Sequence, residues 1–244
     1  MKSLRSHQQD WEALGRVDPL WAVLTSPNRR HGGWDTAEFF ATGVRDVDAL
    51  MSTARTLGLP QRRHDALDFG CGVGRLTRAL AGHFERCVGV DISAPMLAQA
   101  EELNRDCDRC HFVLNATEDL RAFESASFDL IYTRYVLQHL PGRAMVRSYL
   151  SEFMRVLRPG GLLVFQLPNR IGLLHRLQPR RRLYSLLRWL GFNERMLLER
   201  LELTPMRMGF MAEEAVTRLM AELGGKVVRV ERGSAVEHTY FVSR

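Results

Sequence analysis

The chain contains little lysine and no long apolar segment. Only Lys2 and Lys226 are lysines among 244 residues, so arginine supplies almost all of the positive charge behind a formal net charge of +6. No run of about 18 apolar residues occurs, which argues against a membrane-spanning helix. Residues 1–15 are polar and charged and lack the apolar core of a secretory signal. We therefore expect a cytoplasmic protein.

Cysteine is also scarce, with four residues in the chain. Residues 107–111 spell C-x-x-C-H, a c-type haem attachment pattern, but no export signal is present and His111 begins a predicted internal strand. A structural zinc site would need a second pair of ligands, which the sequence does not supply. We expect no bound metal and interpret the cysteines as reduced surface thiols.

The predominance of arginine has two explanations. Arginine binds carboxylates and phosphates through paired hydrogen bonds, so an excess can indicate an anionic partner. Biased codon use in a GC-rich genome accounts for it more simply, and we prefer that explanation. The one local concentration comprises Arg170, Arg176 and residues 180–182.

The most informative segment is A-L-D-F-G-C-G-V-G-R, residues 66–75. It predicts a short apolar strand that ends in a glycine-rich turn, followed by a helix from Leu76 to about Gly82. Glycine lets backbone N–H groups approach a ligand closely because it has no Cβ. Dinucleotide-binding turns require G-x-G-x-x-G, whereas here the spacing is G-x-G-x-G and Arg75 stands at the position of the last glycine. A tight turn in an unrelated α/β domain would look similar.

The following segments make that alternative weaker. Residues 87–93 predict a second apolar strand that ends at Asp91, about where an α/β nucleotide fold presents an acid to ribose hydroxyls. Ser93 is a plausible helix N-cap, and Pro95 fits the first turn of the next helix. Further strands are predicted at residues 111–114, 127–133 and 162–167, with a helix over 143–157 between the last two.

Together these motifs, from about residue 65 to residue 168, resemble those of the class I S-adenosylmethionine-dependent methyltransferases. The resemblance implies a Rossmann-like α/β fold with a seven-stranded, mostly parallel sheet and helices on both faces. It also implies S-adenosylmethionine as cofactor and S-adenosylhomocysteine as product. The positions that match the family's cofactor site are Asp68, Gly70, Cys71, Gly72, Arg75, Asp91, Ile92, Met96, Asn115, Ala116, Thr117 and Arg134.

The resemblance assigns roles to several of these residues. Asp91 would bind the ribose hydroxyls, and Met96 would pack on the adenine, although ordinary core packing explains a methionine equally well. Asn115 replaces the family's usual aspartate, and its amide oxygen can accept the same hydrogen bond from the adenine amino group. Arg75 or Arg134 would neutralise the carboxylate of the cofactor.

Three regions are expected along the chain. Residues 1–64 are predicted to form a helical extension, which either covers the cofactor cleft as a lid or only packs on the sheet. Residues 65–244 form the methyltransferase domain, and residues 169–211 form a helical insertion after the fifth strand. The predicted helices outside the motifs lie near residues 11–24, 35–40, 44–57, 173–190, 194–203 and 212–223, and a closing antiparallel strand pair lies at 226–231 and 238–242.

The expected reaction is methyl transfer to a small molecule, with a hydroxyl of a secondary metabolite, sugar or lipid-like intermediate as acceptor. His139 is the candidate general base, because it follows the fourth strand and titrates near neutral pH. Tyr135 and Arg170 are candidates for substrate binding. No Asn-Pro-Pro-Tyr-type motif follows the fourth strand, which argues against methylation of the exocyclic amines of bases or of glutamine amides. Less favoured alternatives are an RNA methyltransferase, a non-catalytic cofactor-binding protein, and association with a membrane surface.

Overall fold

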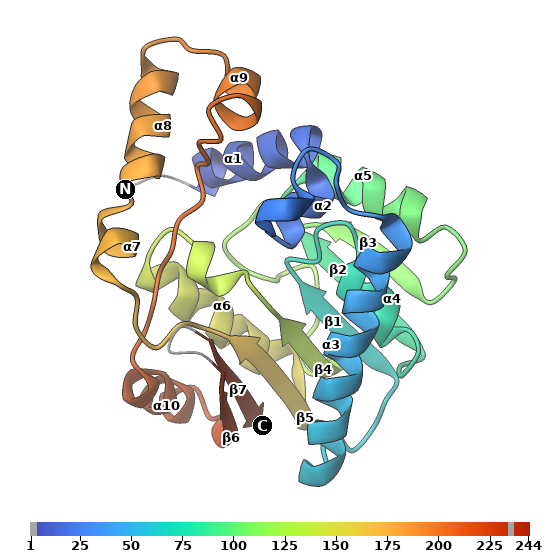
Figure 1. The fold of residues 1–244 in the computed structure, drawn as a ribbon. Coiled ribbons are helices and arrows are strands. Elements are labelled where there is room, and N and C mark those ends of the chain that lie inside the picture. The colour runs from blue at the N-terminus through green and yellow to red at the C-terminus, as the bar shows by residue number, and fades with distance from the viewer. Residues whose placement is uncertain (1–3, 234–236) are drawn as a thin grey trace.

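The computed structural model describes residues 4–233 and 237–244, and its strands and helices form one α/β domain (Figure 1). Three helices precede the first strand, and four lie between the fifth and sixth strands. The helices are α1 Leu4–Val17, α2 Pro19–Val23, α3 Thr36–Leu57, α4 Arg75–Leu80, α5 Ala94–Leu103, α6 Arg143–Val156, α7 Leu173–Leu177, α8 Pro179–Trp189, α9 Glu194–Glu199 and α10 Glu213–Glu222. The strands are β1 Asp65–Phe69, β2 Arg86–Asp91, β3 Cys110–Leu114, β4 Phe128–Thr133, β5 Leu157–Gln166, β6 Lys226–Arg232 and β7 His238–Ser243.

The seven strands form one sheet in the order β3-β2-β1-β4-β5-β7-β6. Strands β1 to β5 run parallel to one another, and β7 runs antiparallel to both β5 and β6. The strand order reverses between β1 and β4, and such a switch point opens a crevice at the carboxyl ends of parallel strands. The sequence prediction of a seven-stranded, mostly parallel sheet is therefore confirmed.

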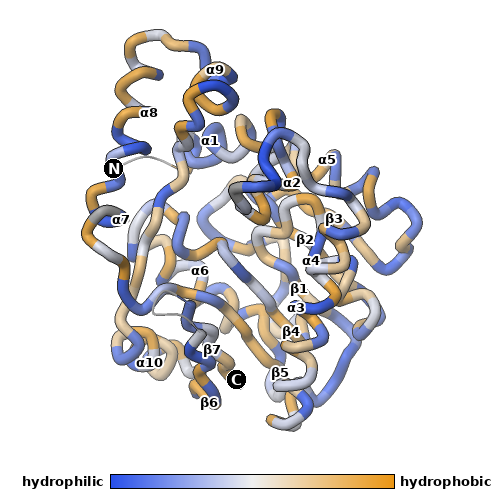
Figure 2. The backbone as a smooth tube through the Cα atoms, in the orientation of Figure 1, coloured by the Kyte–Doolittle hydropathy of each residue, from blue (hydrophilic) through white to orange (hydrophobic). Residues whose placement is uncertain are grey.

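Apolar side chains on both faces of the sheet hold the helices in place. One core cluster joins the sheet to α6 and α10, and a second joins it to α3 and α4. The hydropathy of the chain follows this arrangement, since the central strands are largely apolar (Figure 2). Strands that are buried on both faces give near-continuous apolar runs, which is why the sequence predicted them well.

A third core cluster joins segments that are far apart in the sequence. Leu14 of α1 and Ala22 of α2 are in the same buried cluster as Tyr184 of α8 and Leu197 of α9. Arg30 also donates a hydrogen bond to the carbonyl of Leu198 at 2.7 Å. The N-terminal extension and the insertion thus build one structure over the carboxyl ends of the strands (Figure 1). We call the elements α1, α2, α8 and α9 the cap.

Some local expectations were wrong. The single helix α3 spans Thr36–Leu57, although a break was expected before Val44. Gly43 lies within it, and a Cβ there would lie 2.5 Å from the Arg75 carbonyl oxygen, so this glycine serves close packing instead of ending a helix. Strand β5 begins at Leu157, with a register irregularity opposite Phe128 and Leu130.

The insertion and the cysteines also differ from expectation. The stretch 173–190 divides into α7 and α8 at Gln178, which adopts a φ of 48° before Pro179. Cys71 and Cys87 are buried and Cys107 and Cys110 are half-buried, so the cysteines are not surface thiols. Within the described ranges, no cluster of three metal-ligating side chains occurs, and no helix combines the length and apolar character needed to cross a bilayer.

Candidate functional site

The turn after β1 depends on glycine for both conformation and space. Gly70, Gly72 and Gly74 have φ values of 77°, 55° and 83°, which other residues rarely adopt. A Cβ on Gly70 would lie 2.3 Å from a methyl carbon of Val136. The Gly70 and Cys71 N–H groups donate to the Val90 carbonyl at 2.7 and 3.0 Å. The turn is therefore fixed against the end of β2.

Asp91, the last residue of β2, also holds this turn. Its Oδ2 accepts from the Gly72 N–H and its Oδ1 from the Ser93 N–H, both at 2.9 Å. Burial raises the pKa of the Asp91 carboxyl, and these backbone bonds act in the opposite direction. A carboxylate oxygen has more than one lone pair, so each oxygen can still accept a hydrogen bond from a ligand hydroxyl.

Asp68 lies beneath the turn rather than in the cleft. It is 1% exposed and accepts a hydrogen bond from the Thr77 hydroxyl at 2.7 Å. Burial raises the pKa of Asp68 to about 6, against the lowering effects of the Thr77 bond and of Arg75. The residue supports the turn from within the core.

Two arginines converge on one carboxylate at the open end of the turn. Asp46 of α3 pairs with Arg75 at 2.7 Å and with Arg134 at 2.6 Å. Arg75 is 2% exposed, and its Nε has no hydrogen-bond acceptor among the described residues. Two positive charges against one carboxylate leave this corner favourable for an anionic group.

Tyr135 follows Arg134 and shows backbone strain. Its φ is 61°, and its hydroxyl accepts a hydrogen bond from Arg134 at 2.9 Å. A bulky residue in this conformation is uncommon and costs energy, which makes it a pointer to function.

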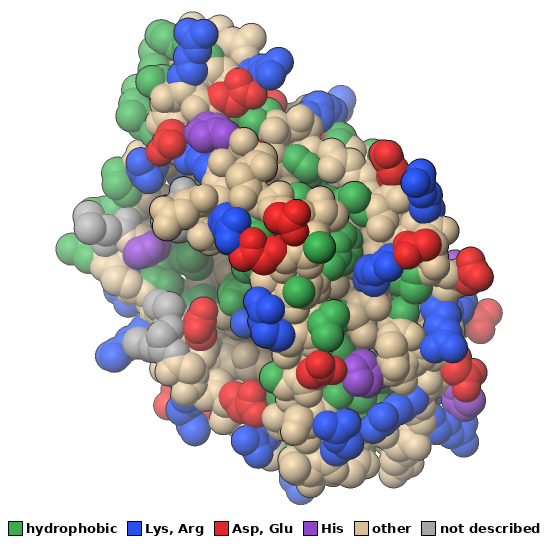
Figure 3. Space-filling model, turned by 45° about the vertical axis from the view of Figure 1, so that its right-hand side comes forward, with side chains coloured by type: hydrophobic (Ala, Val, Ile, Leu, Met, Phe, Trp, Pro, Cys, Tyr) green, Lys and Arg blue, Asp and Glu red, His purple; other side chains and the backbone are tan. Residues whose placement is uncertain are grey.

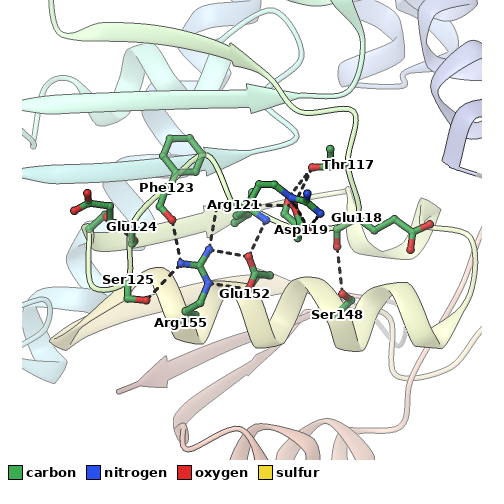
Figure 4. Close-up of polar contacts among 12 residues, drawn as sticks. Thr117, Glu118, Asp119, Arg121, Phe123, Glu124, Ser125, Ser148, Glu152 and Arg155 are labelled. Atoms are coloured by element: carbon green, nitrogen blue, oxygen red, sulfur yellow. Dashed lines mark hydrogen bonds and ion pairs between the residues drawn. The ribbon is translucent and has the colours of Figure 1, made fainter.

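The segment after β3 is fastened to α6. The Arg155 guanidinium donates to the carbonyls of Leu120 and Phe123, both at 3.0 Å, and Glu152 accepts from the Leu120 N–H at 2.8 Å (Figure 4). Asn115 donates to the Asp119 carbonyl at 3.0 Å. This edge of the site is thus held by side chains on a rigid helix.

Two adjoining cavities lie at the carboxyl ends of the strands. The first, of about 80 Å³, lies under the cap and is bordered by Trp11 and Val23. Ligand pockets commonly occupy roughly 300–1,000 Å³, so a ligand here would require the cap to move. The predicted site residues that line this cavity are Gly70, Cys71, Gly72, Arg75, Asp91, Ile92, Met96, Asn115, Arg134, Tyr135 and His139.

The second cavity, of about 700 Å³, lies beside the first and shares Tyr135 and His139 with it. Gln138 and Gln166 line it and are 5% and 4% exposed, and the Oε1 atoms of both lack hydrogen-bond partners among the described residues. Arg181 and Arg207 also line it, and their buried Nε atoms lack acceptors in the same part of the chain. Buried polar atoms without hydrogen-bond partners indicate a binding site for a polar ligand.

His139 lies between the two cavities in a defined hydrogen-bonding state. Its Nδ1 lies 2.5 Å from the Arg207 carbonyl oxygen, which can only accept, so Nδ1 carries the hydrogen and Nε2 has the free lone pair. The ring also packs edge-on against Trp11, with centroids 5.5 Å apart. Burial lowers the pKa of His139 below its usual value, so the imidazole is neutral at neutral pH.

Four predicted site residues do not line either cavity. Ala116, Thr117 and Arg170 are exposed, and Asp68 is buried below the turn. Six further residues that line the cavities were not predicted from the sequence: Trp11, Val23, Gln138, Gln166, Arg181 and Arg207. Among these residues, only Arg181 could have been found from the sequence, because it belongs to the arginine cluster at residues 180–182.

Comparison with known proteins gives a consistent result. Residues 67–165 match a family model described as a methyltransferase domain. The chain is 39% identical over 142 residues to the trans-aconitate 2-methyltransferase of Azoarcus sp., covering 56% of this chain and 51% of that protein. It is 35% identical over 119 residues to the malonyl-[acyl-carrier protein] O-methyltransferase of Salmonella typhimurium, covering 49% of this chain and 43% of that protein. The chain thus spans about half the length of the curated relatives it matches.

Similar folds also occur among solved structures. The magnesium protoporphyrin IX methyltransferase from Synechocystis PCC 6803, crystallised with bound SAH, superimposes with a TM-score of 0.66 at 16% identity. The match covers 99% of this chain and all of that chain. At this identity the match shows a shared fold.

The buried carboxyl of Asp68 predicts an effect of pH on stability. In the unfolded chain it ionises near pH 4, and in the folded protein near pH 6, so the free energy of unfolding should fall as pH rises between these values. Asp68→Asn removes the ionisation, and we expect the variant to gain up to about 3 kcal/mol relative to wild type between pH 4 and pH 7. Urea unfolding at pH 4 and at pH 7 measures the free energy of unfolding of both proteins.

Asp106→Asn is the matched control, because the Asp106 side chain is 64% exposed and paired with Arg78. It should gain no stability at the higher pH. If Asp68→Asn instead lost stability equally at both pH values, the pKa of Asp68 would not be raised, and the turn would need this side chain for its hydrogen bond.

Proposed function

Residues 67–165 match a methyltransferase domain, and on that premise we propose that the protein is a class I S-adenosylmethionine-dependent methyltransferase that methylates a hydroxyl oxygen of a small acidic molecule. The observation that carries the proposal is the pair of adjoining cavities that meet at Tyr135 and His139. One cavity has the groups that the cofactor requires, and the other is large enough for an acceptor.

The residues of the first cavity fit S-adenosylmethionine by their chemistry. Asp91 would accept from the ribose hydroxyls, the buried Nε of Arg75 would donate to the cofactor carboxylate, and Met96 offers an apolar surface to the adenine. When bound, the cofactor supplies a methyl group on a positively charged sulfur. A Cβ on Gly72 would lie 2.3 Å from Val23 of α2, so the cap sits directly on the glycine turn. We propose that the cap is a lid that opens to admit the cofactor.

The ribose assignment is tested at Asp91. We expect Asp91→Ala to weaken binding of S-adenosylmethionine and S-adenosylhomocysteine by about 10- to 150-fold, since a hydrogen bond to a charged group contributes roughly 1.5–3 kcal/mol. Isothermal titration calorimetry measures both affinities. Asp91→Asn retains an acceptor for the Gly72 N–H and should lose less. Asp119→Ala, outside both cavities, is the control, and an affinity for Asp91→Ala equal to wild type would refute the assignment.

The second cavity favours an acceptor that carries an acidic group. Arg181 and Arg207 border it, and the pKa of Arg207 is lowered by burial and, to a smaller extent, by repulsion from Arg181. An anion held between them would relieve this repulsion and satisfy the two buried Nε atoms. Glu237 also borders the cavity, but its side chain is exposed at the rim. The unpartnered amide oxygens of Gln138 and Gln166 can accept from a hydroxyl of the same molecule.

Acceptor choice is therefore predicted to depend on charge. In a panel of hydroxy acids paired with their primary amides, we expect labelled methyl transfer to favour the acids by at least about tenfold in kcat/KM. Arg207→Gln should raise KM for the acids and leave the affinity for S-adenosylhomocysteine unchanged. Equal use of acids and amides would refute the acidic acceptor. Absence of transfer to any member, with the cofactor bound, would favour a non-catalytic cofactor-binding protein.

His139 is the general base in this proposal. Its Nδ1–H donates to the Arg207 carbonyl, which orients the ring and leaves Nε2 to take the proton of the acceptor hydroxyl. Bound S-adenosylmethionine would supply the methyl group to the acceptor oxygen, and its sulfur would keep the electron pair of the carbon–sulfur bond. The imidazole is neutral and ready to act as base because burial lowers its pKa. The cap excludes water and favours the in-line arrangement of the two reactants.

The base role predicts a kinetic effect and a pH dependence. His139→Gln should lower kcat by about 10²–10⁴ while the KM for S-adenosylmethionine stays near that of wild type. Because the pKa of His139 is lowered, wild-type activity should decline only below pH 6.5. Steady-state kinetics over pH 5–9 measure both effects. His111→Gln, on the exposed side of β3, is the control. A loss of less than tenfold in His139→Gln would assign the histidine a structural role.

A further inference from the structure

The insertion exposes apolar side chains to an unusual extent. The described residues include ten exposed large hydrophobic side chains, and eight of them lie between residues 173 and 201. Trp189 is 81% exposed and Leu173 is 70% exposed. In the space-filling view, hydrophobic side chains gather along one side of the protruding part that α8 and α9 form (Figure 3). Clusters of this kind mark interaction sites.

On α8 these side chains share one face. Leu183, Leu186 and Leu190 follow one another at intervals of three and four residues, so they lie in a row along the helix. Trp189 lies next to this row and is also exposed. Tyr184 lies on the opposite face and is buried in the cap core. The fold therefore uses one face of α8 and leaves a second apolar face uncovered. We call Leu173, Leu177, Leu183, Leu186, Trp189 and Leu190 the apolar patch.

The excess positive charge of the protein lies in the insertion, residues 169–211. Residues 169–211 contain nine arginines and three glutamates, an excess of six positive charges that equals the formal net charge of the whole chain. Arg176 and Arg182 are exposed beside the apolar patch. The rest of the chain therefore carries no formal net charge, and the insertion carries the excess positive charge that an anionic surface attracts.

We propose that the insertion docks on the surface of an anionic lipid bilayer, with α7 and α8 lying in the interface. The apolar patch would enter the boundary between headgroups and acyl chains, and the arginines would bind lipid phosphates. A second copy of the chain is a poorer occupant, because joining two patches would bring two arginine-rich segments together. The second cavity is bordered by Pro179 and Arg180 at the start of α8, so docking places its rim beside the bilayer.

Flotation with vesicles tests the proposal on the full chain. Wild type should bind vesicles of phosphatidylcholine that contain phosphatidylglycerol, and bind vesicles of phosphatidylcholine alone at least about tenfold more weakly. The double variant Leu186→Glu with Trp189→Glu should lower binding to the anionic vesicles by at least about tenfold. Val44→Glu is the matched control, because Val44 is an exposed apolar residue on α3, outside the insertion. All variants should retain wild-type melting temperature and affinity for S-adenosylhomocysteine.

Tryptophan fluorescence gives a second measurement. Anionic vesicles should shift the emission of wild type to the blue, and Trp189→Phe should bind the vesicles but lose most of this shift. Vesicle binding that is unchanged in the double variant would overturn the proposal. So would the absence of binding by wild type. A wild-type dimer that the double variant converts to a monomer, as measured by light scattering, would instead identify a second copy as the occupant.

Discussion

The arrangement of the site depends on the carboxylate of Asp91. One oxygen holds the glycine turn through Gly72, and the other holds the Ser93 N–H at the start of α5. The Ser93 hydroxyl in turn accepts from the Met96 N–H and donates to the Trp11 carbonyl, both at 3.4 Å. One side chain at the end of a strand thus links the turn, a helix start and the cap. Its burial is tolerated because both oxygens have donors.

The cap makes the site a joint product of two distant segments. α1 borders the first cavity and packs against α9, while residues of the insertion border the second. Neither segment has a core of its own, because their buried side chains belong to one cluster. Loosening either segment would therefore expose the other, and the two cavities would open together.

The sequence predicted the parts of the protein that depend on local rules. The buried strands, the glycine turn and the acid at residue 91 follow from hydrophobic runs and from backbone conformation, and the predicted fold is confirmed. The predicted helix break before Val44 was wrong because Gly43 lies inside a helix, where it allows close packing against Arg75. Asp68 looked like a ligand residue because a carboxylate near a turn does not reveal on which side of the strand it lies. The second cavity could not be predicted, since residues 138, 166, 181 and 207 come together only through tertiary packing.

Arg207 has two duties that involve different atoms. Its backbone carbonyl fixes the tautomer of His139, and its side chain borders the second cavity. The segment around it is anchored by backbone, since the Gly209 N–H donates to the Gln138 carbonyl and the Met211 N–H to the Pro168 carbonyl. In the proposed reaction, substrate preference and proton transfer therefore depend on the same residue. An insertion transplanted from a relative would bring its own acceptor preference and would also reset the protonation pattern of a histidine that lies outside the transplanted segment.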